Sequence, residues 1–138
     1  MEPLSRNIDL LQGSRLVQAE LRASETREDP YRVEIVFDGQ SVVGVGGDCF
    51  DALLEARRHL ESQGILVCLE GAREDVWPSG MSRSMGAGRK AYRMTLGKQA
   101  LKSDLVDIFA EAKTPASIAE QDAYRHAWFE SLGQAGAE

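Results

Sequence analysis

A tight β-hairpin at residues 31–45 is the feature that most restricts what this chain can fold into. Residues 31, 33, 35 and 37 are apolar and Arg32 and Glu34 lie between them, which is the period of two expected for a strand with one buried face. Asp38-Gly39 then supplies the two residues that a tight turn needs at positive φ. Residues 40–45 return with Val42, Val43 and Val45, so the sequence predicts two antiparallel strands joined by this turn.

A helix is predicted over residues 48–63, directly after the hairpin. Asp48 can cap it, because a carboxylate accepts hydrogen bonds from the unpaired amides of the first helical turn. Arg57, Arg58 and Glu61 are expected largely on the outer face, and Gly64 is expected to end the helix in a left-handed conformation. The apolar face is formed by Phe50, Leu53, Leu54 and Leu60.

The rest of the pattern predicts shorter strands and one further helix. Strands are expected at residues 15–23, 65–69, 90–96 and 104–109, and a helix at 116–132. Residues 1–14 show little periodicity, so we expect a single domain, 1–138, with an irregular N-terminal arm. Repeating strand–helix crossovers are missing, which favours an α+β fold: a mostly antiparallel β-sheet with helices (about 48–63 and 116–132) packed on it.

Composition and sequence ends favour a cytoplasmic protein that does not enter a membrane. No apolar run approaches the roughly 20 residues needed to span a bilayer, and the start of the chain resembles no signal peptide. Cys49 and Cys68 are too few for a disulfide framework or a zinc site, and we expect no metal or other cofactor. A pI near 5.0 argues against a general nucleic-acid binder.

The charges are divided along the chain. All 22 acidic residues lie outside the window 76–103, which carries only positive charges. Such a division sets a local potential that can hold an anion or face an oppositely charged partner surface. The cations of this window are Arg83, Arg89, Lys90, Arg93, Lys98 and Lys102.

The segment 77–92 within this window is the main site candidate. It is too glycine-rich for a simple strand and too irregular for a helix, so we expect a loop. Gly80, Gly86 and Gly88 beside Arg and Lys resemble a phosphate cradle, although their spacing fits neither a P-loop nor a dinucleotide fingerprint. A hairpin loop that needs glycine for its turns is the simpler interpretation. The candidate anion- or partner-binding residues are Trp77, Ser79, Arg83, Arg89, Lys90 and Tyr92.

A second candidate region runs from Asp104 to Glu130. Acidic residues predominate there and are interleaved with aromatic ones, an arrangement that can steer and anchor a basic partner. A solvated face is the simpler interpretation of the same run. The candidate partner-binding residues are Asp104, Asp107, Glu111, Tyr124 and Trp128.

No catalytic residue is assigned. Ser79, Ser82 and Ser84 lack the GxSxG frame of a hydrolase, although a Ser/His/Asp triad remains open because its members converge only in space. Cys49 lies at the predicted helix start, where a thiol pKa falls, but Asp48 and Asp51 oppose thiolate formation, so we expect an inert, partly buried cysteine.

Three stretches together carry a resemblance to known proteins: Gly71–Met81, then Met85-Gly86-x-Gly88 with Ala91-Tyr92, then Asp104–Phe109. They are similar to a group of small bacterial proteins, some of which are immunity proteins paired with contact-dependent or secreted toxins. The resemblance implies a cytoplasmic monomer or weak dimer that binds and occludes a cognate toxin without turnover. Its partner would present a basic cleft to the acidic surface.

Two other classes of function stay open. A small enzyme would have a pocket under the loop 79–92 with a perturbed acid or base. A ligand-sensing module would capture an anionic, phosphate-containing ligand at that basic, glycine-rich loop.

Overall fold

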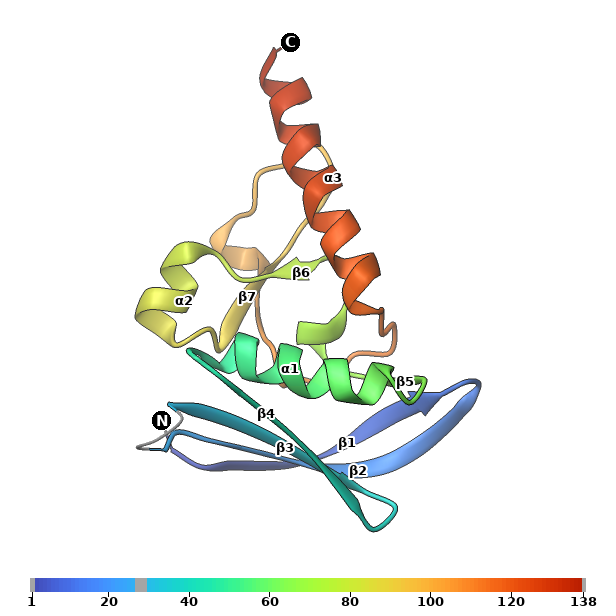
Figure 1. Cartoon of the computed structure of the whole chain (residues 1–138). Helices are drawn as coiled ribbons and strands as arrows, with labels where there is room; N and C mark the ends of the chain where they lie inside the picture. The colour runs from blue at the N-terminus through green and yellow to red at the C-terminus, as the bar shows by residue number, and fades with distance from the viewer. Residues whose placement is uncertain (1, 27–29, 138) are drawn as a thin grey trace.

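The larger of two antiparallel sheets has five strands in the computed structural model, which describes residues 2–26 and 30–137 (Figure 1). Its strand order is β4-β3-β2-β1-β5, so the first four strands follow one another as hairpins and the fifth returns to pair with the first. The strands are β1 (Leu4–Gln12), β2 (Arg15–Ser24), β3 (Tyr31–Phe37), β4 (Gln40–Gly46) and β5 (Ile65–Val67).

The predicted hairpin of β3 and β4 is confirmed. Phe37 pairs with Gln40, and Asp38 and Gly39 take φ values of +47° and +72°. The irregular arm predicted for residues 1–14 is wrong, because Leu4–Gln12 forms β1 and Gly13 turns the chain into β2 with φ +63°. Arg6 interrupts the apolar face of β1 between Leu4 and the buried Ile8, which hid its period of two.

Helix α1 (Cys49–Glu61) packs on the larger sheet and is capped as predicted, since the Asp48 carboxylate accepts from the Asp51 amide at 2.7 Å. The helix lies very close to β4: a Cβ added to Gly44 would be 2.2 Å from the Ala52 carbonyl oxygen. Placing Arg57 on the outer face is wrong, because this side chain is only 1% exposed. Arg57 faces the C-terminal part of the chain, which covers the side of α1 that points away from the larger sheet (Figure 1).

The smaller sheet joins β6 (Val76–Trp77), β7 (Lys90–Arg93) and β8 (Leu105–Asp107). The loop prediction for 77–92 is partly wrong, because α2 (Gly80–Gly86) lies between β6 and β7. The Ser79 hydroxyl accepts from the Ser82 amide at 3.0 Å and so caps α2, which ends where Ala87 takes φ +57°. Two short 3-10 turns, Glu70–Ala72 and Lys102–Asp104, complete this half.

Helix α3 (Ile118–Ala137) is held by a buried side chain in its first turn. The Gln121 amide nitrogen donates to the carbonyls of Gly71 (3.0 Å), Arg73 (3.0 Å) and Val76 (2.8 Å). The predicted helix is therefore present, beside β6 rather than on the larger sheet. Its second half extends away from α1 (Figure 1).

The architecture is the α+β fold with mostly antiparallel sheet that the sequence predicts. Helix α1 lies between the two sheets (Figure 1), and one hydrophobic cluster includes Leu10 and Ile35 from the first sheet, Phe50 and Leu53 from α1, and Ala91 from the second. Across residues 2–26 and 30–137, no helix combines the length and apolarity needed to cross a membrane.

Candidate functional site

Residues from both candidate regions meet at one surface hollow. Trp77, Ser79, Arg83 and Tyr92 from the basic segment line it together with Trp128 from α3, and its volume is about 630 Å³. We call it the aromatic hollow. Its other lining residues are Pro78, Gly80, Met94, Gln99, Ala100, Arg125, Phe129 and Leu132.

Strand pairing and helix contacts build this hollow. Trp77 and Tyr92 are paired across β6 and β7, which places both aromatic side chains in the same sheet. The segment that follows β7 then runs along α3. The Tyr124 hydroxyl donates to the Met94 carbonyl (2.8 Å), and the Trp128 indole nitrogen donates to the Lys98 carbonyl (2.9 Å).

Two guanidinium groups hold the Trp77 ring in place. The Arg125 guanidinium carbon lies 4.6 Å from the ring centroid and that of Arg83 lies 5.7 Å away, both within cation–π range. Phe50 meets the same ring edge to face, with the centroids 5.0 Å apart. The indole is therefore fixed before any ligand arrives, which lowers the entropy lost on binding.

Exposed apolar side chains accompany the hollow. Phe129, which lines it, is 56% exposed, and Leu96 (51%) and Leu101 (62%) lie in the chain segment that runs along α3. An exposed aromatic side chain at the rim of an aromatic hollow is typical of an interaction site.

The arginines of the basic segment already have anionic partners. Arg83 donates to Asp48 (2.9 Å) and Asp51 (3.0 Å), and Arg89 donates twice to Asp107 (2.9 and 3.1 Å). The chain's own carboxylates thus take the positions that an external anion would need. Lys90, Lys98 and Lys102 are exposed.

Gly88 shows how closely this segment packs on α1. Its φ is +67°, and an added Cβ would lie 2.8 Å from the Asp48 carboxylate carbon. The glycine therefore serves a close approach to the helix cap, and the backbone around it is occupied by an internal carboxylate.

The predicted acidic partner residues do not gather at one place. Asp104 accepts from the Leu101 amide (2.8 Å) within a 3-10 turn, and Glu111 is exposed beside a different hollow. Asp107 is paired with Arg89 and also lies 3.3 Å from Arg6. Burial raises the pKa of Asp107, but hydrogen bonds from Arg89 and from the Phe109 amide, together with the charges of Arg89 and Arg6, outweigh it and hold the pKa below its usual value.

The thiol and serine candidates have structural roles. Burial raises the pKa of Cys49 to about 11, which keeps the thiol protonated at neutral pH. The Ser79 hydroxyl is used as the cap of α2. Within residues 2–26 and 30–137, no group of three or more His, Cys, Asp or Glu side chains is placed to hold a metal ion.

Sequence reasoning did not single out Arg125 and Leu132 as site residues. A signal was present, because 125, 128, 129 and 132 recur at spacings of three and four and so share one face of a helix. The lining residues Met94, Gln99 and Ala100 had no such signal, since they enter the site only through the packing of their segment on α3.

No family model matches this chain, and a search of curated proteins finds no match either. The geometry of the aromatic hollow is therefore the basis for the function proposed next.

Proposed function

We propose that this chain is a binding protein that recognises another protein through the aromatic hollow, and that it acts as an immunity protein. It would bind and occlude a cognate toxin in the cytoplasm of the producing cell, without turnover. The observation that carries the proposal is the hollow itself, where Trp77, Tyr92 and Trp128 from separate parts of the chain line one apolar surface depression.

The composition of the hollow supports a protein partner. Trp, Tyr and Arg are the residues that most often dominate binding energy at protein interfaces, and Trp and Tyr bury a large area in few rotamers. Here Trp77 is packed against Phe50 and two arginines, and Trp128 is hydrogen-bonded to Lys98. These rings form a preorganised receptor for an apolar side chain projecting from the partner.

The overall charge of the chain favours a basic partner, although the hollow itself is lined by Arg83 and Arg125 and by no carboxylate. The chain carries a net charge of -6, and exposed Asp122 and Glu130 lie on the same helix as Trp128. A negative protein attracts a basic one over distances of about a Debye length, so association should slow as salt rises. Lys98 and Lys102 lie on the segment that runs along α3. They would repel a partner that places its own positive charges against this segment.

The test is co-expression with a candidate toxin encoded beside the gene for this chain, together with a titration of the two purified proteins. We expect the wild-type chain to restore growth and to bind the toxin in a stoichiometric complex. Phe129→Ser should weaken binding about 30-fold, since a central aromatic anchor is worth about 2 kcal/mol. Leu16→Ser is the matched control, because Leu16 is similarly exposed (60%, against 56% for Phe129) but lies in the β1–β2 hairpin.

Protection that persists in a variant unable to bind the toxin would show that occlusion is not the mechanism. The ligand-sensing alternative makes a separate prediction, because a phosphate ligand must displace Asp48 and Asp107 from Arg83 and Arg89. Calorimetric titration with ATP, NAD or short RNA should therefore give no binding. Micromolar binding that is lost in Arg89→Ala would instead favour that alternative.

A further inference from the structure

Strand β1 is covered on one side along only part of its length. Its other neighbour in the sheet, β5, has three residues and pairs with Leu10, Leu11 and Gln12. Just beyond β5, the Cys68 amide donates to the Asp9 carbonyl (3.0 Å), and the chain then turns away. Within the described part of the chain, no strand pairs with residues 4–8 on this side.

The backbone of this part of β1 presents open hydrogen-bonding groups. In an antiparallel strand, the N–H and C=O of every second residue point to the same edge. Because the Asp9 carbonyl points toward β5, the backbone groups of Asn7 and Ser5 point to the same side. The main-chain bonds to β2 are made by the alternate residues and are not affected.

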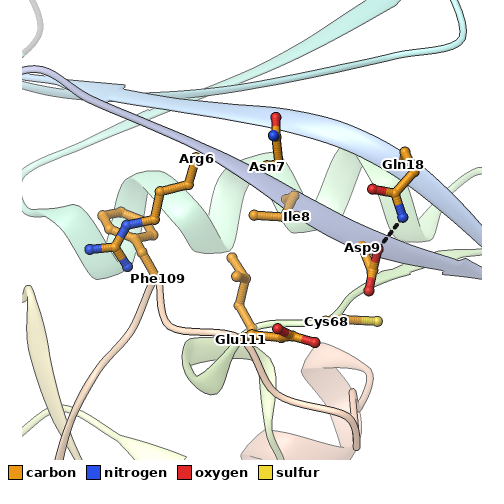
Figure 2. A pocket seen from close by; sticks show the side chains of 9 residues that line it. Arg6, Asn7, Ile8, Asp9, Gln18, Cys68, Phe109 and Glu111 are labelled. Atoms are coloured by element: carbon orange, nitrogen blue, oxygen red, sulfur yellow. Dashed lines mark hydrogen bonds between the residues drawn. The ribbon is translucent and has the colours of Figure 1, made fainter.

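A hollow of about 590 Å³ lies beside this edge (Figure 2). It separates β1 from the segment 109–111, and its apolar lining is provided by Ile8, Leu69 and Phe109. All three side chains are buried, at 7%, 0% and 1% exposure. We call it the edge hollow, and its volume falls within the range of about 300 to 1,000 Å³ that ligand sites occupy.

The charges of the edge hollow are unequal at its two ends. Arg6 and Phe109 line one end (Figure 2), where Arg6 is already paired with Asp107 at 3.3 Å. The carboxylates of Asp9 and Glu111 lie at the other end, near Cys68 (Figure 2). The end near Cys68 therefore presents two negative charges, which favour a cationic side chain.

We propose that the edge hollow binds an extended, basic segment of another protein, which adds to β1 as a further strand. The segment's backbone pairs with the open groups of Ser5 and Asn7, and a Lys or Arg side chain reaches Asp9 and Glu111. Strand addition is a common mode of peptide recognition, in which main-chain bonds supply affinity and side-chain contacts supply specificity. The proposal is independent of the toxin-binding function, because the aromatic hollow and the edge hollow share no lining residue.

The first test uses a blocked eight-residue peptide of alternating Lys and Val as the probe, added to the isotopically labelled full chain. We expect saturable binding, with shifts at the amides of residues 5–9 and 68 and slower hydrogen exchange at Ser5 and Asn7. The same peptide methylated at alternate backbone nitrogens should bind at least about tenfold more weakly, because it cannot donate to the edge. A peptide with Glu in place of Lys should bind several-fold more weakly.

Variants of the chain provide the second test. Asn7→Pro removes one open donor from the edge without removing a bond to β2, so it should weaken peptide binding while the fold is retained. Glu111→Gln should weaken binding of the Lys peptide, whereas Glu130→Gln, an exposed carboxylate on α3, serves as the matched control.

The methylated peptide tests the wild-type chain and so decides the matter even if Asn7→Pro does not fold. Equal binding of methylated and unmethylated peptides, equal binding of the Glu peptide, or shifts confined to another surface would overturn the proposal. So would a dimer in which Ser5 and Asn7 are already protected, since a second copy would then occupy the edge.

Discussion

Arg57→Met is the substitution that most directly tests how the two halves of this chain are joined. Arg57 leaves α1 and donates to the Gln121 side-chain oxygen at 2.6 Å and to the Ala116 carbonyl at 3.1 Å. Gln121 in turn donates to three carbonyls that precede or lie within β6. Methionine has a similar volume and no donor, so the substitution removes these bonds without leaving a large cavity.

The expected loss of stability follows from the acceptors that remain. Two buried oxygens, on Gln121 and Ala116, lose their donor, while the Gly71 carbonyl keeps its bond from Gln121. Hydrogen bonds from a charged donor contribute about 1.5 to 3 kcal/mol each, and part of this is offset because a guanidinium no longer has to be desolvated. We therefore expect the free energy of unfolding to fall by about 3 kcal/mol.

Urea denaturation followed by Trp77 and Trp128 fluorescence measures this change, with Arg58→Met as the control. Arg58 is the next residue of the same helix and is exposed, so its substitution should change stability by less than about 0.5 kcal/mol. The double variant Arg57→Met with Gln121→Leu should lose less free energy of unfolding than the two single variants lose together. Each single substitution leaves one partner of the Arg57–Gln121 hydrogen bond unpaired, whereas the double variant removes both partners. A loss below about 1 kcal/mol, or additive effects, would refute this account of the interface.

Three further outcomes are expected. Gly44→Ala should lower the free energy of unfolding by about 3 kcal/mol or more. The new Cβ would lie 2.2 Å from the Ala52 carbonyl oxygen and would force α1 away from β4. An unchanged melting temperature, measured by circular dichroism, would contradict this prediction. The ion pairs of Asp107 hold its pKa below the usual value. Their contribution to the free energy of unfolding is therefore fully present above the unfolded-state pKa of about 3.9, and it is lost as the pH falls through the lower folded-state pKa. Between pH 5 and pH 2, Asp107→Asn should therefore lose less free energy of unfolding than the wild type, as measured by urea titrations at each pH. Equal losses in the two proteins would contradict this prediction. Cys49, with its pKa raised to about 11 by burial, should react with a thiol reagent at pH 8 on the order of 100-fold more slowly than an unfolded control; equal rates would show that the thiol is accessible and ionised.

The parts of the fold that depend on local sequence could be predicted. The Asp38-Gly39 turn and the Asp48 cap are set by backbone conformation and by side chains within a few residues, and both are confirmed. Strand β1 was missed because Arg6, which reaches Asp107 far along the chain, stands at an inward position. The burial of Arg57 was missed for the same reason, since its partners Ala116 and Gln121 are distant in sequence.

The candidate site could be predicted in its residues but not in its shape. Trp77 and Tyr92 were recognisable as candidates because they lie in the basic, glycine-rich segment, and Trp128 because it lies among acidic residues. The interpretation of Arg83 and Arg89 as candidate anion- or partner-binding residues did not account for Asp48 and Asp107, which approach them only in the folded chain. The three arginines of the segment 76–103 thus pair with carboxylates elsewhere in the chain, whereas its three lysines are exposed.

The order of strands in the larger sheet has a consequence for synthesis on the ribosome. Strands β1 to β4 pair as successive hairpins, and α1 follows them, so these elements can assemble before the later strands and α3 have emerged from the ribosome. The smaller sheet has to wait for β8, because β7 pairs with both β6 and β8. During that interval the side of α1 that carries Arg57 lacks its cover, and we expect the nascent chain to be most prone to aggregation and to bind chaperones there.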